Sequence, residues 1–382
     1  MRENWQGARA LTVLASAWLA MWVGGCGDAE QDPQPGGDNE AGTPADSATV
    51  PGDCGEGGTQ VDDACVCKPG YIAGEKGCVR AKCDTPQGPA MSTVHQGAEL
   101  RFTTASGDAV EVGYALGPGA AEPGAWVDGP GLRLTDKIGT GAVSVFARVK
   151  GKDCGKETWF SLTYNVQKAY APAAGKEGSD AVAKDDGKIV GWATGYVEPV
   201  TYGKNVFDSW KKPEKALGPA EGTSTDIVCL GDGGSITLKF DPPIRDGEGA
   251  DFAVFENSFD DGFLELGYVE VSTDGETFVR FGSAYLGNDP VGGFGKHDLT
   301  LIGGLAGRYR QGFGTPFDLG VLVNDPEVRR GKVRLSQIRY VRVVDIVGDG
   351  KSLDSFGHPI YDPHPTQQSA GFDLDAIAVL HH

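Results

Sequence analysis

The stretch Gly-Ala-Asp-Phe-Ala-Val-Phe-Glu-Asn at residues 249–257 decides how the C-terminal half of this chain folds. Side chains alternate between the two faces of a β-strand, so Phe252 and Val254 point one way and Ala253 and Phe255 the other. Both faces are apolar over this part of the stretch. The pattern therefore predicts a central strand that is covered on both sides.

The same stretch becomes polar on both faces at its C-terminal end, at Glu256 and Asn257. A carboxylate and an amide at the end of a buried strand need partners, because an unpaired buried polar group costs free energy. Backbone groups, a metal ion or a ligand could supply these partners. Glu256 and Asn257 are therefore candidate ligand-binding residues.

The composition of the 382-residue chain limits the class of partner. The formal net charge is −19, which argues against nucleic-acid binding because few basic groups are left to neutralise phosphates. Acidity favours solubility and is compatible with a hard cation such as calcium. The length leaves room for two or three domains after an N-terminal leader.

Residues 1–26 resemble a bacterial lipoprotein signal peptide. An apolar run at residues 10–23 follows two arginines and is short for a transmembrane helix. Small residues then precede Cys26 as in a lipobox, which implies lipidation of Cys26 and anchoring at the outer membrane or cell surface without a membrane span. An ordinary signal peptide with an unmodified Cys26 is the alternative. Residues 27–53 have almost no large apolar side chain and predict a disordered tether.

Clustered cysteines predict a disulfide-stapled module at residues 54–83. A Cys-x-Cys pair, a Pro-Gly-Tyr turn and a closing cysteine resemble the C-terminal half of an EGF-like module. With this resemblance we expect the pairs Cys67–Cys78 and Cys54–Cys65, while a third pair would bracket the next domain. The expected disulfide cysteines are Cys54, Cys65, Cys67, Cys78, Cys83 and Cys154.

The spacing of the cysteines also bears on metal binding and on the remaining cysteine, Cys229. A zinc site fits poorly, because the spacing is wrong and the segment has no nearby histidine. Cys229 stands in the apolar run Ile-Val-Cys-Leu at residues 227–230 and is expected to be a buried free thiol.

Residues 84–167 predict a small β-sandwich, because short alternating segments are separated by Gly, Pro and Asp. The order of the segments resembles immunoglobulin-like or fibronectin-like spacers, which implies a role in holding another domain away from the membrane. Residues 168–187 show no periodicity and predict a linker. The alternating segments are residues 100–103, 110–114, 143–149 and 160–166.

Residues 188–382 predict an all-β jelly roll, since strand patterns are frequent, helices are nearly absent and the loops are rich in glycine. The expected strands, besides the opening stretch, are residues 235–240, 268–272, 277–281, 338–345 and 372–380.

Two motifs in this block resemble discoidin-type, galactose-binding-like jelly rolls: Ser-Thr-Asp-Gly-Glu-Thr-Phe at residues 272–278 and Arg-Tyr-Val-Arg-Val at residues 339–343. The block is also similar to a poorly described bacterial "cell surface protein" family. That resemblance implies a location and a fold more than an activity. The motifs shared with the family lie at residues 233–238, 249–257, 361–366 and 371–376.

Acidic residues near the expected strand ends suggest a cation site. Asp373 and Asp375 would share a strand face that Ile377 continues into the core, and Asp246 and Asp251 crowd the loop before residue 252. Calcium takes six to eight oxygens from such loops, and galactose-binding-like jelly rolls often hold one structural calcium ion. The expected metal ligands are therefore Asp246, Asp251, Asp373 and Asp375. The alternative is that these residues form turns and solvated rims.

Rings and polar groups near glycine-rich loops suggest a shallow sugar site. Aromatic rings cover the C–H faces of sugars, while carboxylates and amides bind the hydroxyl groups. The expected ligand-binding residues are Glu256, Asn257, Tyr361 and Asp373. The alternative is that the rings cap the core under long loops. The aromatic residues in question are Trp192, Tyr196, Tyr202, Trp210, Phe263, Tyr285, Phe294, Tyr309, Phe313, Phe317 and Tyr361.

The sequence contains no Gly-x-Ser-x-Gly elbow and no His-Glu-x-x-His motif, and Gly-Asp-Gly-Lys-Ser at residues 348–352 lacks the first glycine of a phosphate loop. We therefore expect no enzymatic activity. The favoured function is a non-catalytic cell-surface lipoprotein that binds a glycan or another small extracellular ligand. A hydrolase of envelope or extracellular polysaccharide and a structural envelope protein without a ligand are the two alternatives.

Overall fold

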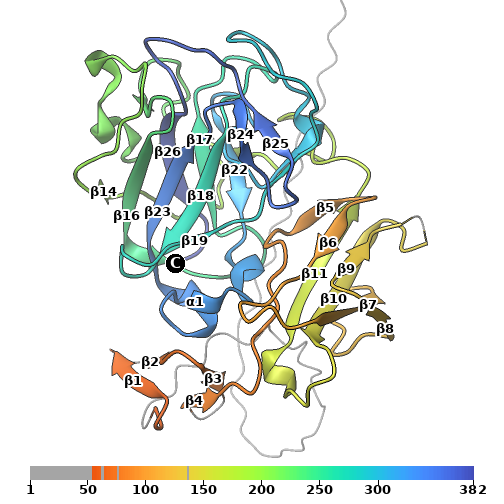
Figure 1. Ribbon diagram of the computed structural model, residues 1–382. Coiled ribbons are helices and arrows are strands. Elements are labelled where there is room, and N and C mark those ends of the chain that lie inside the picture. The colour runs from red at the N-terminus through yellow and green to blue at the C-terminus, as the bar shows by residue number, and fades with distance from the viewer. Residues whose placement is uncertain (1–53, 62–63, 75–76, 136) are drawn as a thin grey trace, which may run out of the picture. The chain divides into compact units, whose positions relative to one another are not determined.

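The computed structural model describes residues 54–61, 64–74, 77–135 and 137–382. The expected signal peptide at residues 1–26, the lipidation of Cys26 and the tether at residues 27–53 lie outside the described residues. The described chain is almost entirely β-structure, as predicted (Figure 1). In this part of the chain no helix is long and apolar enough to cross a membrane.

Two antiparallel sheets form the C-terminal sandwich, and each has a long strand at its centre (Figure 1). In one sheet β17 (Phe252–Glu256) lies between β22 (Phe313–Phe317) and β26 (Asp373–Val379), with β12 (Val182–Ala183), β13 (Gly191–Trp192) and β15 (Val228–Cys229) at its margins. In the other sheet β23 (Ile338–Asp345) lies between β16 (Ser235–Ile244) and β18 (Gly267–Ser272), with β14 (Gly195–Tyr196) and β19 (Val279–Arg280) at the edges.

The long strands alternate between the two sheets along the chain. Strands β16, β18 and β23 belong to one sheet, and β17, β22 and β26, which follow them in turn, belong to the other. This alternation produces a jelly-roll sandwich, the fold class predicted from the strand pattern.

Strand β17 is central and buried on both faces, as predicted. All five of its residues are buried. Phe252 and Val254 contact the main core between the sheets, while Ala253 and Phe255 pack on the opposite face with a smaller cluster that includes Trp192. The apolar alternation of the sequence is thus satisfied by two separate sets of contacts.

Short elements complete the C-terminal block. Two small two-stranded sheets lie in its loops: β20 (Ala284–Tyr285) pairs with β21 (Ile302–Gly303), and β24 (Asp349–Leu353) pairs with β25 (Pro359–Tyr361). The single α-helix of the described chain, α1, covers Pro326–Arg329. The 3-10 helices here are η2 (Asp208–Trp210), η3 (Pro213–Ala216), η4 (Leu299–Leu301), η5 (Leu319–Leu322) and η6 (Leu335–Gln337).

The cysteine-rich segment forms two small hairpins, β1 (Gly58–Val61) with β2 (Ala64–Cys67) and β3 (Tyr71–Gly74) with β4 (Gly77–Arg80). The disulfide bonds are Cys54–Cys65, Cys67–Cys78 and Cys83–Cys154, which are the expected pairs. Cys229 is the free, buried cysteine of the described residues.

Residues 84–167 form a small sandwich with its own core. Its main sheet has the order β5 (Thr93–His95), β11 (Phe160–Gln167), β10 (Gly141–Val149), β7 (Val110–Leu116) and β8 (Ala125–Asp128). Strands β6 (Glu99–Arg101) and β9 (Gly131–Arg133) pair separately, and η1 covers Lys156–Thr158. The core includes Leu100, Phe102, Val145, Phe160 and Tyr164.

Residues 168–187 are not a free linker, which corrects the interpretation from composition. Tyr170 and Ala174 are each 4% exposed and contact two different core clusters. The backbone carbonyls of Ala171 and Ala174 accept hydrogen bonds from Arg308 and Arg310. The segment lacks periodicity because its burial depends on contacts with distant residues.

Candidate functional site

The loop at residues 257–264, hereafter the ligand loop, leaves the polar end of β17 and returns to β18. Its turn is built by Ser258 and Asp260: the Ser258 hydroxyl donates to the carbonyls of Asp260 and Phe263, and the Asp260 carboxylate accepts the N–H groups of Gly262 at 2.8 Å and Phe263 at 2.9 Å. The Lys296 ammonium and these two amides hold the pKa of Asp260 at about 2. The loop is therefore held in shape by its own polar groups.

Three phenyl rings stack on the ligand loop and its neighbour, and we call Phe259, Phe263 and Phe294 the phenyl stack. The ring centroids of Phe259 and Phe263 are 4.8 Å apart with an interplanar angle of 20°, and those of Phe263 and Phe294 are 6.4 Å apart with an angle of 26°. Phe294 is 91% exposed and Phe259 is 59% exposed. Large apolar rings at such exposure and close to one another are unusual on a protein surface, which makes the phenyl stack a candidate binding surface.

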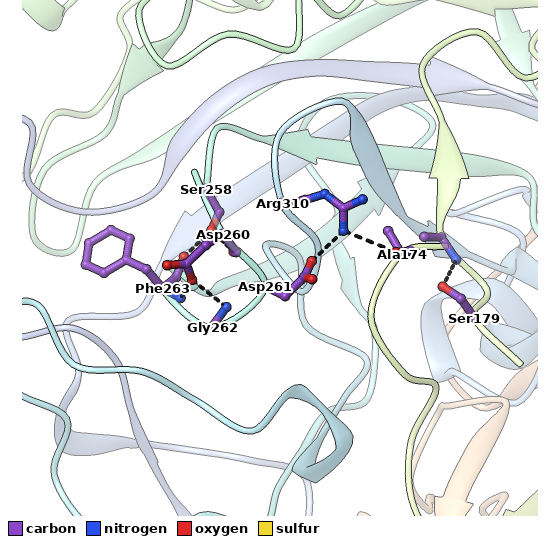
Figure 2. A network of polar contacts seen from close by, with 9 residues as sticks. Ala174, Ser179, Ser258, Asp260, Asp261, Gly262, Phe263 and Arg310 are labelled. Carbon is purple, nitrogen blue, oxygen red and sulfur yellow. Dashed lines mark hydrogen bonds and ion pairs between the residues drawn. The ribbon is translucent and has the colours of Figure 1, made fainter. Parts of the chain in front are cut away.

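Two ion pairs flank the phenyl stack. Lys296 contacts Asp260 at 2.5 Å, and Arg310 contacts Asp261 at 2.6 Å. Arg310 also donates to the carbonyl of Ala174 at 3.1 Å. Figure 2 shows Arg310 between Asp261 and Ala174, and the ring of Phe263 turned away from these polar groups. The site therefore presents apolar faces beside charged groups that are already positioned.

Asn257 forms the inner polar margin of the ligand loop. Its amide nitrogen lies 3.3 Å from Asp373 Oδ2 and 3.3 Å from the carbonyl of Ser224. The Ser224 hydroxyl in turn donates to Gln311 Oε1 at 2.8 Å. The structure thus brings together Asn257 and Asp373, which the sequence analysis placed in one expected sugar site.

Three buried carboxyl groups lie beneath the ligand loop: Glu256, Glu265 and Asp373, hereafter the acid cluster, are 1%, 4% and 5% exposed. Burial raises the pKa of Glu256 and of Glu265 well above the usual range, and the charge of Asp373 raises both further. Burial also raises the pKa of Asp373 to about 7. Glu256 therefore does not reach a ligand at the surface, in contrast to its expected role.

The four expected metal ligands do not form one site. Strand β26 is antiparallel to β17, with Phe252 opposite Val379 and Glu256 opposite Leu374. Asp251 therefore lies at one end of the strand pair and Asp373 at the other. The prediction failed because it combined residues from both ends.

Asp246 and Asp251 do lie together, but with Asp318. One oxygen from each of these three residues lies within 4.8 Å of the others. Asp251 is fully satisfied by protein groups, since it accepts the N–H groups of Gly247 at 2.8 Å and Leu319 at 2.7 Å and contacts His381 Nδ1 at 2.9 Å. This arrangement explains the buried carboxylate without a cation.

The Asp375 side chain binds backbone N–H groups of a neighbouring loop and does not bind at the candidate site. Its carboxylate accepts the N–H groups of Glu221 at 3.0 Å and Gly222 at 2.8 Å. The expected shared face of Asp373, Asp375 and Ile377 is wrong, because the pairing of β17 with β26 is irregular between Phe255 and Glu256. Leu374, not Asp375, lies with Ile377 in the core. A bulge shifts the side chains to the opposite face and breaks the simple alternation.

Tyr361 is in β25, and its ring meets that of Tyr285 edge to face at a centroid distance of 6.3 Å. Of the aromatic residues noted in the sequence, Phe263 and Phe294 belong to the phenyl stack, whereas Tyr285, Tyr309 and Phe317 are buried in cores. Phe259, Lys296 and Arg310 were not predicted from the sequence. The repeated phenylalanines among Gly and Asp at residues 259–263 and 294 were the available signal.

A groove of about 310 Å³ lies beside Lys296 and is lined by Tyr285, His297, Asp289 and Asp298 among others. The Tyr285 hydroxyl is 3.3 Å from His297 Nδ1. Burial lowers the pKa of His297 to about 4, so its imidazole is neutral at physiological pH. The groove therefore combines the neutral imidazole of His297 with the acidic side chains of Asp289 and Asp298.

Comparison with known proteins adds little to this geometry. No family model and no curated protein matches the chain. Two solved structures are similar over most of the chain. One is described as a SusE-like protein, with 9% identity, 77% of this chain and 95% of that chain covered, and a TM-score of 0.23. The other is from work on the promiscuous specificity of carbohydrate-binding modules of the β-sandwich superfamily, with 11% identity, coverage of 78% and 98%, and a TM-score of 0.17. At these TM-scores neither similarity enters the functional argument.

Proposed function

We propose that this chain is a non-catalytic carbohydrate-binding protein and that the phenyl stack with the ligand loop is its sugar-binding surface. The observation that carries the proposal is the contact of three phenyl rings at one exposed place, with Phe294 91% exposed. Leaving such rings in water forgoes roughly 1.5–3 kcal/mol of burial for each side chain. A ligand with an apolar face would recover part of this free energy.

Sugar chemistry fits the groups around the rings. A pyranose presents C–H faces to aromatic rings and hydroxyl groups to charged or amide partners. Asp260 and Lys296 lie on one side of the stack, and Asn257 is at the inner margin of the loop. Both signs of charge are paired, so a neutral glycan is the expected ligand class rather than a strongly charged one.

Burial argues against the hydrolase alternative at this site. A glycosidase needs two carboxyl groups on either side of the scissile bond. Glu256 and Asp373 have the raised pKa values of a general acid, but they are 1% and 5% exposed. A glycosidic oxygen cannot reach a carboxyl group that the protein covers.

The proposed location is the outer surface of a bacterial envelope, reached by export and lipidation of Cys26. This part of the proposal rests on the sequence of residues 1–26, with the apolar run that ends at Cys26. The small β-sandwich at residues 84–167 would then act as a spacer between the membrane and the sugar-binding jelly roll. Mass spectrometry of the membrane fraction for a lipid-modified Cys26 tests the anchor.

A glycan array probed with the exported chain tests the function. Phe294→Ala and Phe259→Ala are expected to weaken binding at least tenfold, since aromatic contacts dominate such surfaces. Phe207→Ala is the matched control, because Phe207 is 57% exposed but outside the phenyl stack, and binding is expected to be unchanged. A reducing-sugar assay on the bound glycans should stay silent. Failure to bind any glycan, or equal loss in the control, would contradict the proposal.

A further inference from the structure

The outer face of one sheet of the jelly roll presents a row of charged side chains, which we call the arginine row. Its members are paired across the neighbouring strands β16, β23, β18 and β19, and they are Thr237, Arg342, Glu270 and Arg280. Directly paired residues point to the same face of a sheet. The residues on either side of Arg342 and of Glu270 lie in the core between the two sheets. The arginine row therefore lies on the opposite face, which points away from that core.

The two arginines of the row share a single carboxylate. Arg280 Nε and Nη2 lie 2.8 Å and 2.7 Å from Glu270 Oε1. Arg342 Nε donates to Glu270 Oε2 at 2.5 Å, and Arg342 Nη2 contacts the same oxygen. Among the described residues, Glu270 is the only carboxylate that forms an ion pair with either arginine. A guanidinium has five N–H donors, so the donors on the Nη1 side of each arginine have no carboxylate partner in the described chain.

Aromatic rings hold both guanidinium groups in place. Arg280 Cζ lies 4.3 Å from the ring centroid of Tyr268, and Arg342 Cζ lies 3.8 Å from that of Phe278. A guanidinium that stacks on a ring and binds a carboxylate has little freedom left. The two arginine side chains are nevertheless 46% and 33% exposed. The row thus offers positioned donors to the solvent, and a ligand would lose little side-chain entropy on binding them.

Lys239 adds a third cation to the same face. It is paired with Tyr340 in the next row of the sheet. Arg342 is two residues from Tyr340, so Lys239 and Arg342 are diagonal neighbours at roughly 7–8 Å. Lys239 is exposed, and its ammonium forms no ion pair within the part of the chain that the structure describes. The face therefore has more positive than negative charge.

The acidic side chains at the ends of these strands are engaged by other groups. Asp241 lies 3.9 Å from Arg339, and Asp274 accepts two backbone N–H groups of its own turn. The whole chain has a net charge of −19, but the Debye length is about 8 Å at physiological ionic strength. A ligand that lies on this face therefore responds mainly to the arginine row and Lys239.

We propose that the arginine row and Lys239 bind an acidic polysaccharide, whose sugar units carry carboxylate or sulfate groups. Such oxyanions match the paired N–H donors of a guanidinium. The half-buried ring of Tyr340 beside them offers an apolar surface to the C–H groups of a sugar. A lipid surface fits less well, because none of these residues is an exposed large apolar side chain that could enter a bilayer.

This second site is independent of the function proposed for the phenyl stack. None of its residues belongs to the ligand loop or to the phenyl stack, and its ligand is charged rather than neutral. One surface protein would then contact two kinds of glycan through two different surfaces.

Calorimetric titration of the exported chain with an oligogalacturonate tests the site. Binding is expected at physiological salt, and it should be lost in about 1 M salt, where the Debye length falls to about 3 Å. The methyl-esterified oligomer has the same sugar rings without the charges and should not bind. Equal binding of both oligomers, or no binding of the acidic one, would overturn the proposal. Binding to phosphatidylglycerol vesicles in place of the oligomer would reassign the face to a lipid headgroup.

Substitutions locate the binding. Lys239→Gln removes an exposed charge and should leave folding unchanged while it weakens binding about threefold. Arg342→Gln removes a charged hydrogen bond to the ligand and should weaken binding about tenfold or more, with a melting curve to confirm that the variant is folded. Lys188→Gln is the matched control, because Lys188 is exposed and forms no ion pair among the described residues.

Phe294→Ala separates this site from the phenyl stack and should bind the acidic oligomer like the parent chain. A loss of binding in Phe294→Ala, with binding retained in Lys239→Gln and Arg342→Gln, would place the acidic oligomer on the phenyl stack and refute the assignment.

Discussion

Gly307 lies against the backbone under the ligand loop, and its replacement by alanine is a severe test of the packing described here. A Cβ at this position would be 1.8 Å from the carbonyl oxygen of Glu265 and 3.1 Å from the ring of Phe372. The glycine also has a φ of +83°, which costs a residue with a side chain roughly 1 kcal/mol. Because the nearest atom belongs to the backbone, the segment before β18 must move, and we expect Gly307→Ala to cost more than about 4 kcal/mol.

Gly312→Ala supplies the matched control. Its φ is +82°, nearly the same as that of Gly307, but nothing lies within 4 Å of the added Cβ. Only the cost of the positive φ applies to Gly312→Ala, so the free energy of unfolding is expected to fall by about 1 kcal/mol. Urea unfolding followed by tryptophan fluorescence measures both variants. Equal losses in the two would show that backbone conformation alone matters and that the close approach at Glu265 is not real.

Two further substitutions test the interior of the sandwich and the disulfide frame. Glu270 is 7% exposed and pairs with Arg280 at 2.7 Å and with Arg342 Nε at 2.5 Å. Because the two arginines are partly exposed, Glu270→Gln should lower the free energy of unfolding by only about 1–2 kcal/mol. A loss below about 0.5 kcal/mol would mean that the ion pairs contribute little. Replacing Cys83 and Cys154 by serine opens a loop with a sequence separation of 71, and the chain-entropy relation gives a cost of about 4 kcal/mol. Calorimetry should show an earlier transition for that variant; an unchanged trace would contradict the relation here.

The strands that were predicted from the sequence are those in which the alternation of side chains between the two faces runs through the whole strand. Strand β23 was expected at residues 338–345 and covers Ile338–Asp345, and β26 was expected within one residue at each end. Strand β22 was not expected, although it pairs with β17, because its sequence Phe-Gly-Thr-Pro-Phe contains glycine and proline. Such residues are poor strand formers, and only the neighbouring strand makes them extended.

Some residues of the candidate site were predicted from the sequence, whereas others come together only through the folding of the loops. Asn257 and Asp373 were expected in one ligand site, and the structure puts their side chains 3.3 Å apart. The sequence also predicted Asp251 and Asp373 in one metal site, and the antiparallel pairing of β17 with β26 excludes this because it puts Asp251 at the far end. The stacking of Phe259 on Phe263, by contrast, depends on the turn that Asp260 forms, and the contact with Phe294 joins loops far apart in sequence.

The two ends of β17 bury their carboxyl groups in different ways. Asp251 and Glu256 are both buried and flank the same apolar strand. Asp251 receives two backbone N–H groups and contacts a histidine, so the fold accounts for every oxygen that it buries. Glu256 leaves one oxygen without a partner in the described chain and shares its surroundings with Glu265 and Asp373. Burial raises the pKa of Glu256, Glu265 and Asp373 and therefore favours their neutral forms. The end of β17 with the unpartnered oxygen is also the end that leads into the ligand loop and the phenyl stack.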